Sequence, residues 1–297
     1  MKESERHIYV TGDTHGSQAA IEELIDFMEQ MLKAEDNSDQ RHSEEAMADE
    51  HSTSELARED ECITCEPKDP DILIITGDFG AGLFDDEHRS EKSFFDEITE
   101  KEILILFCDG NHENHDELNA LPVKEWCGGK VHMLRPNIIH LMRGEVYTID
   151  GETIFAFGGG YSMDLGFNPF RVPGVAYWKE EMPSEEEYEN GRINLQKAGC
   201  KIDYVITHTF PVDSKGMLGG IKDLPEERPL TYYLQHDVFD ALSDQESFVK
   251  ESAYKRWYFG HLHIDKEIWR RQYAVLKYVR DLRTGEIVFT RTKFAGA

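Results

Sequence analysis

Five short clusters of polar residues, each directly after an apolar run, contain side chains that could bind metal ions. They read Gly12-Asp13-Thr14-His15-Gly16, Gly77-Asp78-Phe79-Gly80, Gly110-Asn111-His112-Glu113, Thr207-His208-Thr209 and Gly260-His261-Leu262-His263. Together they supply two Asp, one Asn and five His, a mixture of oxygen and nitrogen ligands that suits Mn, Fe or Zn. The clusters therefore predict a metal centre where several strands end in loops.

The spacing within the first three clusters suggests which residues could bind metal ions and which could transfer protons. Asp13 and His15 lie two residues apart, so in extended backbone they would point the same way and could bind one cation. A carboxylate such as Asp78 can bridge two cations held ~3.5–4 Å apart. Asn111 offers a neutral carbonyl oxygen, and the adjacent His112 cannot easily bind the same ion, which leaves it available for proton transfer.

The last two clusters contribute only histidines. His208 ends a strand, and His261 and His263 are again two residues apart. If His261 faces one cation, His263 can face another only through a loop that bends between them. The remaining histidines are interpreted as structural or surface groups, and of these His115 is nearest to the chemistry and has no assigned role: His7, His42, His51, His88, His115, His132, His140 and His236.

The bulk composition limits the class of protein. The chain has 297 residues, 39% of them hydrophobic, enough to build a core, and no apolar stretch approaches the ~20 residues that span a bilayer. The charged first residues, 1–7, predict no signal peptide. An odd, unpatterned set of five cysteines favours reduced thiols and a cytoplasmic protein without a membrane partner.

The net charge of −27 disfavours nucleic acid as a partner, because such binding depends mainly on Lys and Arg. A nucleotide or phosphoprotein substrate remains compatible with this charge, since bound divalent cations would reverse the local potential in the site. The simplest interpretation of the acidity is a solubilising surface.

Apolar periodicity places the clusters on secondary structure. Strands are expected at 8–10, 71–76, 103–108, 204–207 and 257–259, with helices at about 17–32, 87–101 and 230–250. Strands at 146–149 and 153–157 flank Asp150-Gly151, a hairpin turn pair, and Ser184 opens an acidic helix with a capping box. A final strand pair is expected at 275–279 and 287–290. The pattern predicts two mixed sheets packed together with helices outside.

Residues 34–67 interrupt this pattern. Between Lys33 and Glu66 there are twelve acidic and three basic residues, without clear periodicity, so we expect a flexible acidic insertion within one domain spanning residues 1–297. Cys62 and Cys65, with His42 and His51 upstream, could form a zinc clip. Incidental cysteines are the alternative, because a single C-x-x-C pair is a weak signal.

The order D-x-H, G-D, G-N-H-E, H and G-H-x-H resembles that of the calcineurin-like metallophosphoesterases. The resemblance runs from residue 8 to about residue 265, interrupted by the acidic insertion. It implies an α/β fold, a four-layer α/β/β/α sandwich of two mixed sheets with flanking helices. It also implies a dinuclear metal centre at the carboxyl ends of the strands.

Residue by residue, the resemblance implies the following roles. Asp13, His15 and His263 would bind one cation, Asn111, His208 and His261 the other, and Asp78 would bridge them. A bridging hydroxide would attack phosphorus, His112 would act as proton donor, and Glu113 would support the site from behind. The two divalent cations would be Mn, with Fe, Zn or Ni as alternatives.

One departure from the wider superfamily bears on the substrate. Its protein Ser/Thr phosphatases continue the second motif as G-D-x-x-D-R-G, whereas residues 77–83 here read GDFGAGL. A substitute cation could come from Arg171, at the end of the loop that begins at Gly158-Gly159-Gly160. The alternative is a plain glycine-rich turn with a surface arginine.

The function predicted from the sequence is metal-dependent hydrolysis of a phosphoester. The substrate would be a phosphorylated small molecule, a nucleotide or a protein. One alternative keeps the chemistry and makes the protein a nucleotide or dinucleotide polyphosphate hydrolase. A second, of another class, is a catalytically silent metal-binding interaction protein. A nuclease is disfavoured by the net charge.

Overall fold

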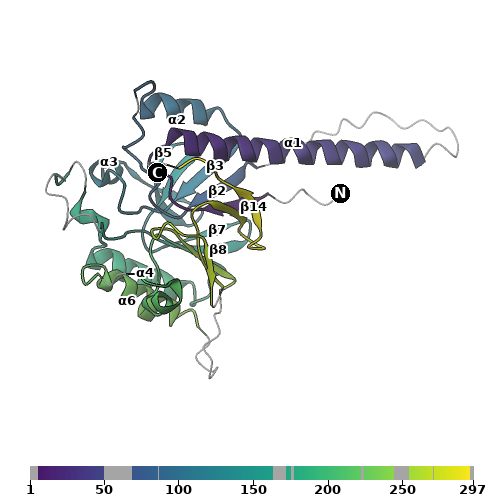
Figure 1. Cartoon of the computed structure of the whole chain (residues 1–297). Coiled ribbons are helices and arrows are strands. Elements are labelled where there is room, and N and C mark those ends of the chain that lie inside the picture. The colour runs from purple at the N-terminus through teal and green to yellow at the C-terminus, as the bar shows by residue number, and fades with distance from the viewer. Residues whose placement is uncertain are drawn as a thin grey trace.

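Two β-sheets pack face to face in the computed structural model, and helices cover the outer side of each (Figure 1). The structure describes residues 6–49, 69–85, 87–162, 172–174, 177–221, 224–243, 254–269 and 271–294. For residues 35–49 it describes the helical backbone alone.

The first sheet has eight strands in the order β14-β13-β1-β2-β3-β6-β5-β4. Its centre is parallel and consists of β1 (Ile8–Thr11), β2 (Asp71–Ile75), β3 (Ile103–Phe107) and β6 (Ile138–Leu141). Antiparallel strands extend it on both sides: β13 (Tyr278–Asp281), β14 (Ile287–Thr290), β5 (Gly129–Arg135) and β4 (Val123–Trp126).

The second sheet has six strands in the order β11-β12-β10-β9-β8-β7. Parallel pairing joins β8 (Glu152–Phe157), β9 (Tyr204–Thr207), β10 (Arg256–Phe259) and β12 (Gln272–Ala274), while β7 (Glu145–Ile149) and β11 (Lys266–Ile268) are antiparallel edges. Asp150 and Gly151 connect β7 to β8 with φ of 51° and 77°. Positive φ at both positions is what a two-residue hairpin turn requires, so this prediction is confirmed.

Strand alternation divides the apolar side chains between three buried layers. In β2, Ile72 and Ile74 pack between the two sheets, whereas Leu73 and Ile75 face the helices of the first sheet. A third cluster, which includes Phe155, lies between the second sheet and its helices. Three apolar layers between helix, sheet, sheet and helix make the predicted four-layer α/β/β/α sandwich, which is confirmed.

The helices form the two outer layers. α1 (Gln18–Asp49) and α2 (Glu91–Thr99) cover the first sheet, and α4 (Glu185–Lys197) and α6 (Arg228–Tyr233), which continues into the π-helix η4 (Leu234–Phe239), cover the second. Short helices occupy the connections: α3 (His115–Ala120), η2 (Lys179–Glu181), η3 (Val212–Ser214) and α5 (Lys215–Leu218). Ser184 and Glu187 form the predicted capping box at α4. Among the described residues, no helix is long and apolar enough to span a bilayer.

Helix α1 corrects one prediction. Its apolar face, with Ile21, Leu24 and Met28 fully buried, stops near Leu32, where the helix was expected to end. The helix instead continues to Asp49 and projects beyond the sheets (Figure 1). Periodicity reports packing against a core, whereas Ala, Glu, Gln and Met favour helix without one. The first half of the predicted flexible insertion is therefore helical, and its second half, 50–67, lies outside the described residues.

The C-terminal strands correct another prediction. Residues 275–279 were expected to be one strand, but β12 ends at Ala274 in the second sheet and β13 begins at Tyr278 in the first. The chain crosses between sheets at this point, and a run of apolar letters does not reveal such a crossing. Helix α2 is also shorter than expected, and of the helix expected at 230–250, residues 244–250 lie outside the described residues.

Candidate metal centre

The five polar clusters follow five strands: β1, β2 and β3 in the first sheet, and β9 and β10 in the second. Parallel neighbours within each sheet bring their carboxyl ends to one edge. Close contacts between residues of both sheets, described below, show that the two edges meet. The clusters therefore converge although residues 13 and 263 are far apart in the sequence.

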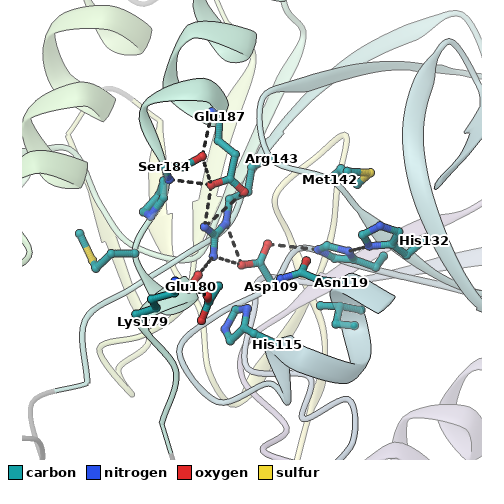
Figure 2. Close-up of a pocket in the computed structure, with 14 residues that line it drawn as sticks. Asp109, His115, Asn119, His132, Met142, Arg143, Lys179, Glu180, Ser184 and Glu187 are labelled. Atoms are coloured by element: carbon teal, nitrogen blue, oxygen red, sulfur yellow. Dashed lines mark hydrogen bonds and ion pairs between the residues drawn. The ribbon is translucent and has the colours of Figure 1, made fainter. Parts of the chain in front are cut away.

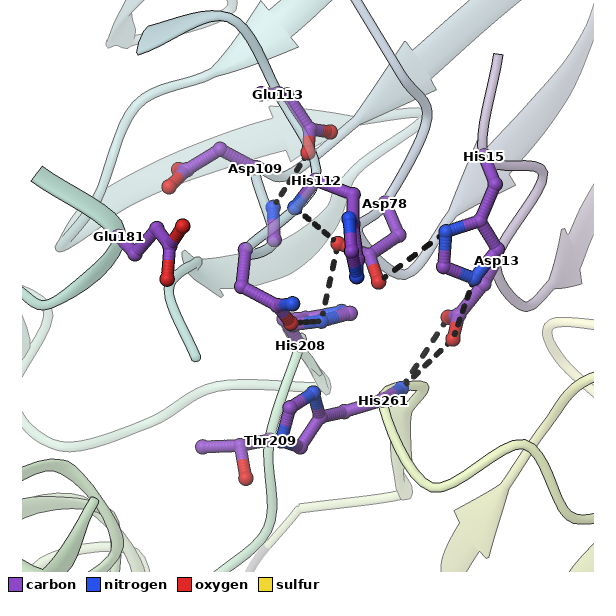
Figure 3. A network of polar contacts seen from close by, with 12 residues as sticks. Asp13, His15, Asp78, Asp109, His112, Glu113, Glu181, His208, Thr209 and His261 are labelled. Carbon is purple, nitrogen blue, oxygen red and sulfur yellow. Dashed lines mark hydrogen bonds and ion pairs between the residues drawn. The ribbon is translucent and has the colours of Figure 1, made fainter. Parts of the chain in front are cut away.

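Asp78 lies at the centre of this convergence (Figure 3). Its side chain is buried, with 1% of the residue exposed. Its two carboxylate oxygens face different histidines: Oδ2 is 3.8 Å from His15 Nδ1, and Oδ1 is 3.4 Å from His208 Nε2. The backbone N–H of His112 also donates to Oδ1, over 2.8 Å. The carboxylate thus stands between two groups of potential ligands.

On one side of Asp78 lie Asp13, His15 and His263, which we call the first half-site. His263 Nε2 is 3.2 Å from Asp13 Oδ2 and 2.8 Å from His15 Nε2. One ligand atom from each of these residues and from Asp78 falls within 4.8 Å of all the others. That spacing is compact enough for one cation to contact the whole group.

On the other side lie Asn111, His208 and His261, the second half-site. His208 Nε2 is 3.1 Å from Asn111 Oδ1, and the ring centroids of His208 and His261 are 4.9 Å apart. The backbone N–H of His261 donates to the Asp13 carboxylate, over 3.1 Å to Oδ2. The two half-sites therefore share Asp78 and are also joined through the backbone at His261.

Strained backbone aims several of these side chains. His15 and Asp78 have φ of 48°, His261 of 65° and His263 of 51°, values that are uncommon for residues other than glycine. The expectation that Asp13 and His15 point the same way in extended backbone is therefore wrong, because the chain turns at His15. The expected bend between His261 and His263 is present. Such left-handed residues cluster at functional sites, where the surrounding structure holds them in place.

The glycines of two motifs are required by close packing. A Cβ at Gly110 would lie 2.1 Å from Asp78 Oδ1, and a Cβ at Gly260 would lie 2.1 Å from Asp13 Oδ1. Either side chain would displace a buried carboxylate. These glycines let the loops that carry Asn111 and His261 approach the two aspartates.

The charges in the site are strongly coupled. Burial alone would raise the pKa of the Asp78 carboxyl group, but the neighbouring histidines, above all His208, outweigh burial and hold that pKa well below its usual range. Burial would lower the pKa of His208, but Asp78 outweighs it and raises the pKa to about 10. Burial lowers the pKa of His15, and a hydrogen bond with Asp13 raises that of His263. Asp78 thus remains anionic, as cation binding requires.

The family model for calcineurin-like phosphoesterases matches residues 6–265. The chain belongs to this family. The resemblance read from the five motifs is thereby confirmed, as is the prediction of a phosphoesterase family.

A similar protein is a lariat debranching enzyme of Schizosaccharomyces pombe, 26% identical over 162 residues. The alignment includes 50% of this chain and 33% of the relative. The chain thus spans about a third of the length of the curated relative it matches.

His112 and Glu113 of the G-N-H-E motif have distinct surroundings in this phosphoesterase chain. The half-buried ring of His112 lies beside the first half-site, with its centroid 4.9 Å from that of His15. Glu113 is fully buried and accepts hydrogen bonds from the backbone N–H groups of Phe79 (2.9 Å) and Gly110 (3.3 Å). Burial, with Asp78 and Asp109 nearby, raises the pKa of Glu113 well above its usual value. Glu113 therefore clamps the second motif to the third.

Behind the G-N-H-E motif lies a cavity of about 530 Å³ (Figure 2), and none of the predicted ligands lines it. On its wall Asp109 accepts from Arg143 Nε over 2.9 Å and contacts His140 Nε2 at 3.1 Å. His140 in turn lies 3.2 Å from His132. Burial lowers the pKa of His132 and His115 to about 4, so both rings are neutral near pH 7. This buried network supports the motif from behind. It involves His132 and His140, which the sequence analysis interpreted as structural or surface groups, and His115, to which it assigned no role.

Several supporting residues were not found from the sequence. Ser162 accepts a hydrogen bond from Asn111 Nδ2 (3.1 Å), and Glu227 lies 2.9 Å from His261 Nε2. Neither belongs to a recognisable motif, and nothing in their local sequence distinguishes them. Arg171, Cys62 and Cys65 lie outside the described residues, so the substitute cation and the zinc clip remain predictions.

Proposed function

We propose that this protein hydrolyses phosphoesters at a dinuclear metal centre. Asp13, His15 and His263 would hold one cation and Asn111, His208 and His261 the other, with Asp78 between them. One observation carries the proposal: the two oxygens of a single buried carboxylate, Asp78, face histidines of two different half-sites, at 3.8 and 3.4 Å.

The residues fit divalent cations by their chemistry. Two buried aspartates lie among imidazoles and one amide oxygen, and buried carboxylates of this kind are commonly balanced by bound cations. The mixed nitrogen and oxygen ligands suit Mn, with Fe, Zn or Ni as alternatives. When bound, the cations would polarise a phosphoryl oxygen and lower the pKa of a water molecule that serves as nucleophile.

His112 is proposed as the proton donor. Its backbone N–H is fixed on Asp78 Oδ1 at 2.8 Å, and its ring stands beside the first half-site rather than within either ligand set. A positioned imidazole at this place can protonate the oxygen of the departing alcohol. Glu113 and the Asp109–Arg143 pair hold the loop that carries it.

The substrate class is proposed as a small phosphoester, with nucleotides and dinucleotide polyphosphates included. The absence of the G-D-x-x-D-R-G motif argues against a phosphoprotein phosphatase. A second candidate is a branched nucleic acid, because the relative of 26% identity is named for lariat debranching. The net charge of −27 weighs against long nucleic acids, whose affinity depends on cationic contacts along the backbone. The three described cysteines are free, which supports the predicted reducing, cytoplasmic location.

The test is a hydrolysis screen of the full chain. Chelator-treated protein would be loaded separately with Mn, Fe, Zn or Ni and assayed on p-nitrophenyl phosphate, bis-p-nitrophenyl phosphate, a dinucleoside polyphosphate and a branched oligoribonucleotide. We expect turnover that depends on added metal and is lost again on chelation. Two bound cations without turnover on any substrate would support the metal-binding interaction protein, and absence of metal binding would refute both proposals.

A further inference from the structure

Glu227 is a buried carboxylate directly beside the second half-site. Only 6% of the residue is exposed, and it immediately precedes α6 without capping that helix through its side chain. Its Oε1 lies 2.9 Å from His261 Nε2. A buried carboxylate is expensive unless its hydrogen-bonding capacity is used, so the contacts of Glu227 indicate what it is for.

Those contacts join three segments around the second half-site. Thr209, the residue after His208, donates its hydroxyl to Glu227 Oε1 over 3.2 Å. The backbone N–H of Tyr161 also donates to the Glu227 carboxylate. Tyr161 follows Gly160, whose Cα approaches His208, Asn111 and His261 so closely that a Cβ would lie 2.9–3.3 Å from each. Glu227 therefore connects the loops on which the second half-site is built.

The contact with His261 also fixes the chemistry of that ring. A neutral imidazole carries one N–H and one lone pair. Because Nε2 faces a carboxylate, which accepts hydrogen bonds, Nε2 carries the proton and Nδ1 carries the lone pair. Only Nδ1 is then available as a ligand atom. Such a carboxylate behind a metal-bound histidine orients the ring and raises its basicity.

We propose that Glu227 is the positioning residue for His261, holding its ring in the tautomer that presents Nδ1 to the cation of the second half-site. The inference rests on the proposed function, because it assumes that His261 binds that cation. It adds a residue from outside the five motifs to the metal centre, and it makes the second half-site dependent on the loop before α6.

The first test needs no metal and no change to Glu227. The full chain, labelled with ¹⁵N-histidine and stripped of metal, would be compared by NMR with the His261→Gln variant to assign the His261 signals. In the neutral form of this ring we expect the proton on Nε2 and the lone pair on Nδ1. A neutral ring with its proton on Nδ1 would overturn the proposal.

The second test measures Mn²⁺ binding by calorimetry and elemental analysis in Glu227→Gln and Glu227→Ala. Glu226→Gln is the matched control, because Glu226 is the neighbour of Glu227 in the sequence and its side chain is exposed. Glu227→Ala should lower the affinity for one of the two cations by ~10–100-fold, the usual effect of losing such a partner. The affinity for the other cation should not change. Glu227→Gln keeps the volume and an acceptor oxygen, so it should fold as the wild type and lose less affinity.

The outcomes separate this inference from the proposed function. If the wild-type chain binds fewer than two cations, the dinuclear function itself fails. If the wild type binds two and both Glu227 variants do so with unchanged affinity, only the role of Glu227 is refuted. Equal weakening of both cations together with a lower Tm would show a structural role instead, and would also refute the inference.

Discussion

The two half-sites share Asp78 but are built differently. In the first, the side chain of His263 is 57% exposed and that of His15 20%, and the polar contacts of these rings are with each other and with the two predicted aspartate ligands. In the second, His208 is fully buried, and its Nδ1 lies 2.9 Å from the backbone oxygen of Thr76. The second half-site is supported by groups that are not themselves predicted ligands, whereas the first depends on contacts among its ligands.

This difference in support determines how each half-site would respond to a cation. Ligands fixed by outer hydrogen bonds, such as Asn111 on Ser162 and His261 on Glu227, lose little further freedom on binding. In the first half-site, the Nε2 atoms of His15 and His263 lie 2.8 Å apart, a distance at which two lone pairs repel unless a proton or cation lies between them. We therefore expect the second half-site to hold its cation more tightly, and the exposed first half-site to exchange its cation and admit substrate.

The largest effect is expected where the two half-sites meet. Asp78→Asn keeps the side-chain volume but removes the negative charge that both half-sites share. Because paired cations stabilise the transition state by several kcal/mol, the rate of hydrolysis should fall by ~10⁴-fold or more. Circular dichroism would establish that the fold is kept, and elemental analysis would count the metals. Near-wild-type activity with two bound cations would contradict the shared-carboxylate arrangement.

His112 tests whether chemistry can be separated from metal binding in both half-sites. His112→Ala should keep two cations and slow turnover by ~10²–10⁴-fold, the usual contribution of a positioned acid. The loss should shrink for p-nitrophenyl esters, whose leaving group needs little protonation. An equal loss for good and poor leaving groups would point instead to stabilisation of charge in the transition state.

The sequence predicts the ligands better than it predicts their support. Asp13, Asp78 and His208 follow buried apolar strands, so periodicity and residue type locate them. The parallel pairing of these strands within each sheet then brings their ends to one edge. Glu227 and Arg143 lie outside such motifs, and their roles arise only from tertiary contacts. A sequence scan therefore finds the more exposed half-site and the ligands of the buried one, but not what holds the latter together.

The fold shows the same limit. Strands β1, β2 and β3 were predictable because each is a continuous apolar run, and β2 is buried at every position. Strand β4 was missed because Val123, Lys124 and Glu125 are exposed and carry no alternating pattern. The length of α1 was missed for the related reason that its distal half projects beyond the sheets. Pattern analysis detects burial, and elements that bury little leave little trace in it.

Removing one histidine from each half-site would test the comparison directly. His208→Ala should lower the affinity for one cation by more than ~100-fold. This loss should exceed that from removing a residue, such as Glu227, that only positions a ligand. His263→Ala should cost only ~10-fold, because water can replace an exposed ring. Calorimetry with Mn²⁺ on both variants checks the order, and a larger loss in His263→Ala would reverse the assignment of the tighter half-site.

The buried pair should also give metal-free protein a particular pH dependence. Since Asp78 raises the pKa of His208 from 6.5 to about 10, the folded state holds this proton more tightly than the unfolded state. The resulting stability is complete below pH 6.5 and is lost as pH rises toward 10. Between pH 6.5 and ~8.5, below the range of thiols, the Tm of chelated protein should fall, and the fall should be smaller in His208→Gln.

The same proton must be displaced when a cation binds at His208, so the Mn²⁺ affinity of the second half-site should rise over this pH range. A Tm of the chelated wild type that stays flat from pH 6.5 to 8.5 would contradict the pairing of His208 with Asp78.

The smallest effect is expected from a single outer contact of the second half-site. Ser162→Ala removes the acceptor for Asn111 Nδ2, which lies 3.1 Å from Ser162 Oγ. This hydrogen bond orients the amide group so that Asn111 Oδ1 faces His208. A hydrogen bond of this kind is worth ~0.5–1.5 kcal/mol, so the affinity for one cation should fall by ~3–10-fold. Ser243→Ala is the matched control, because its buried hydroxyl donates to Phe239 within the helix region over 2.7 Å and contacts neither half-site. If both serine variants lose Tm equally but only Ser162→Ala loses Mn²⁺ affinity, the rigidity of the second half-site depends on its outer contacts. If neither loses affinity, the burial of His208 alone accounts for the difference between the half-sites.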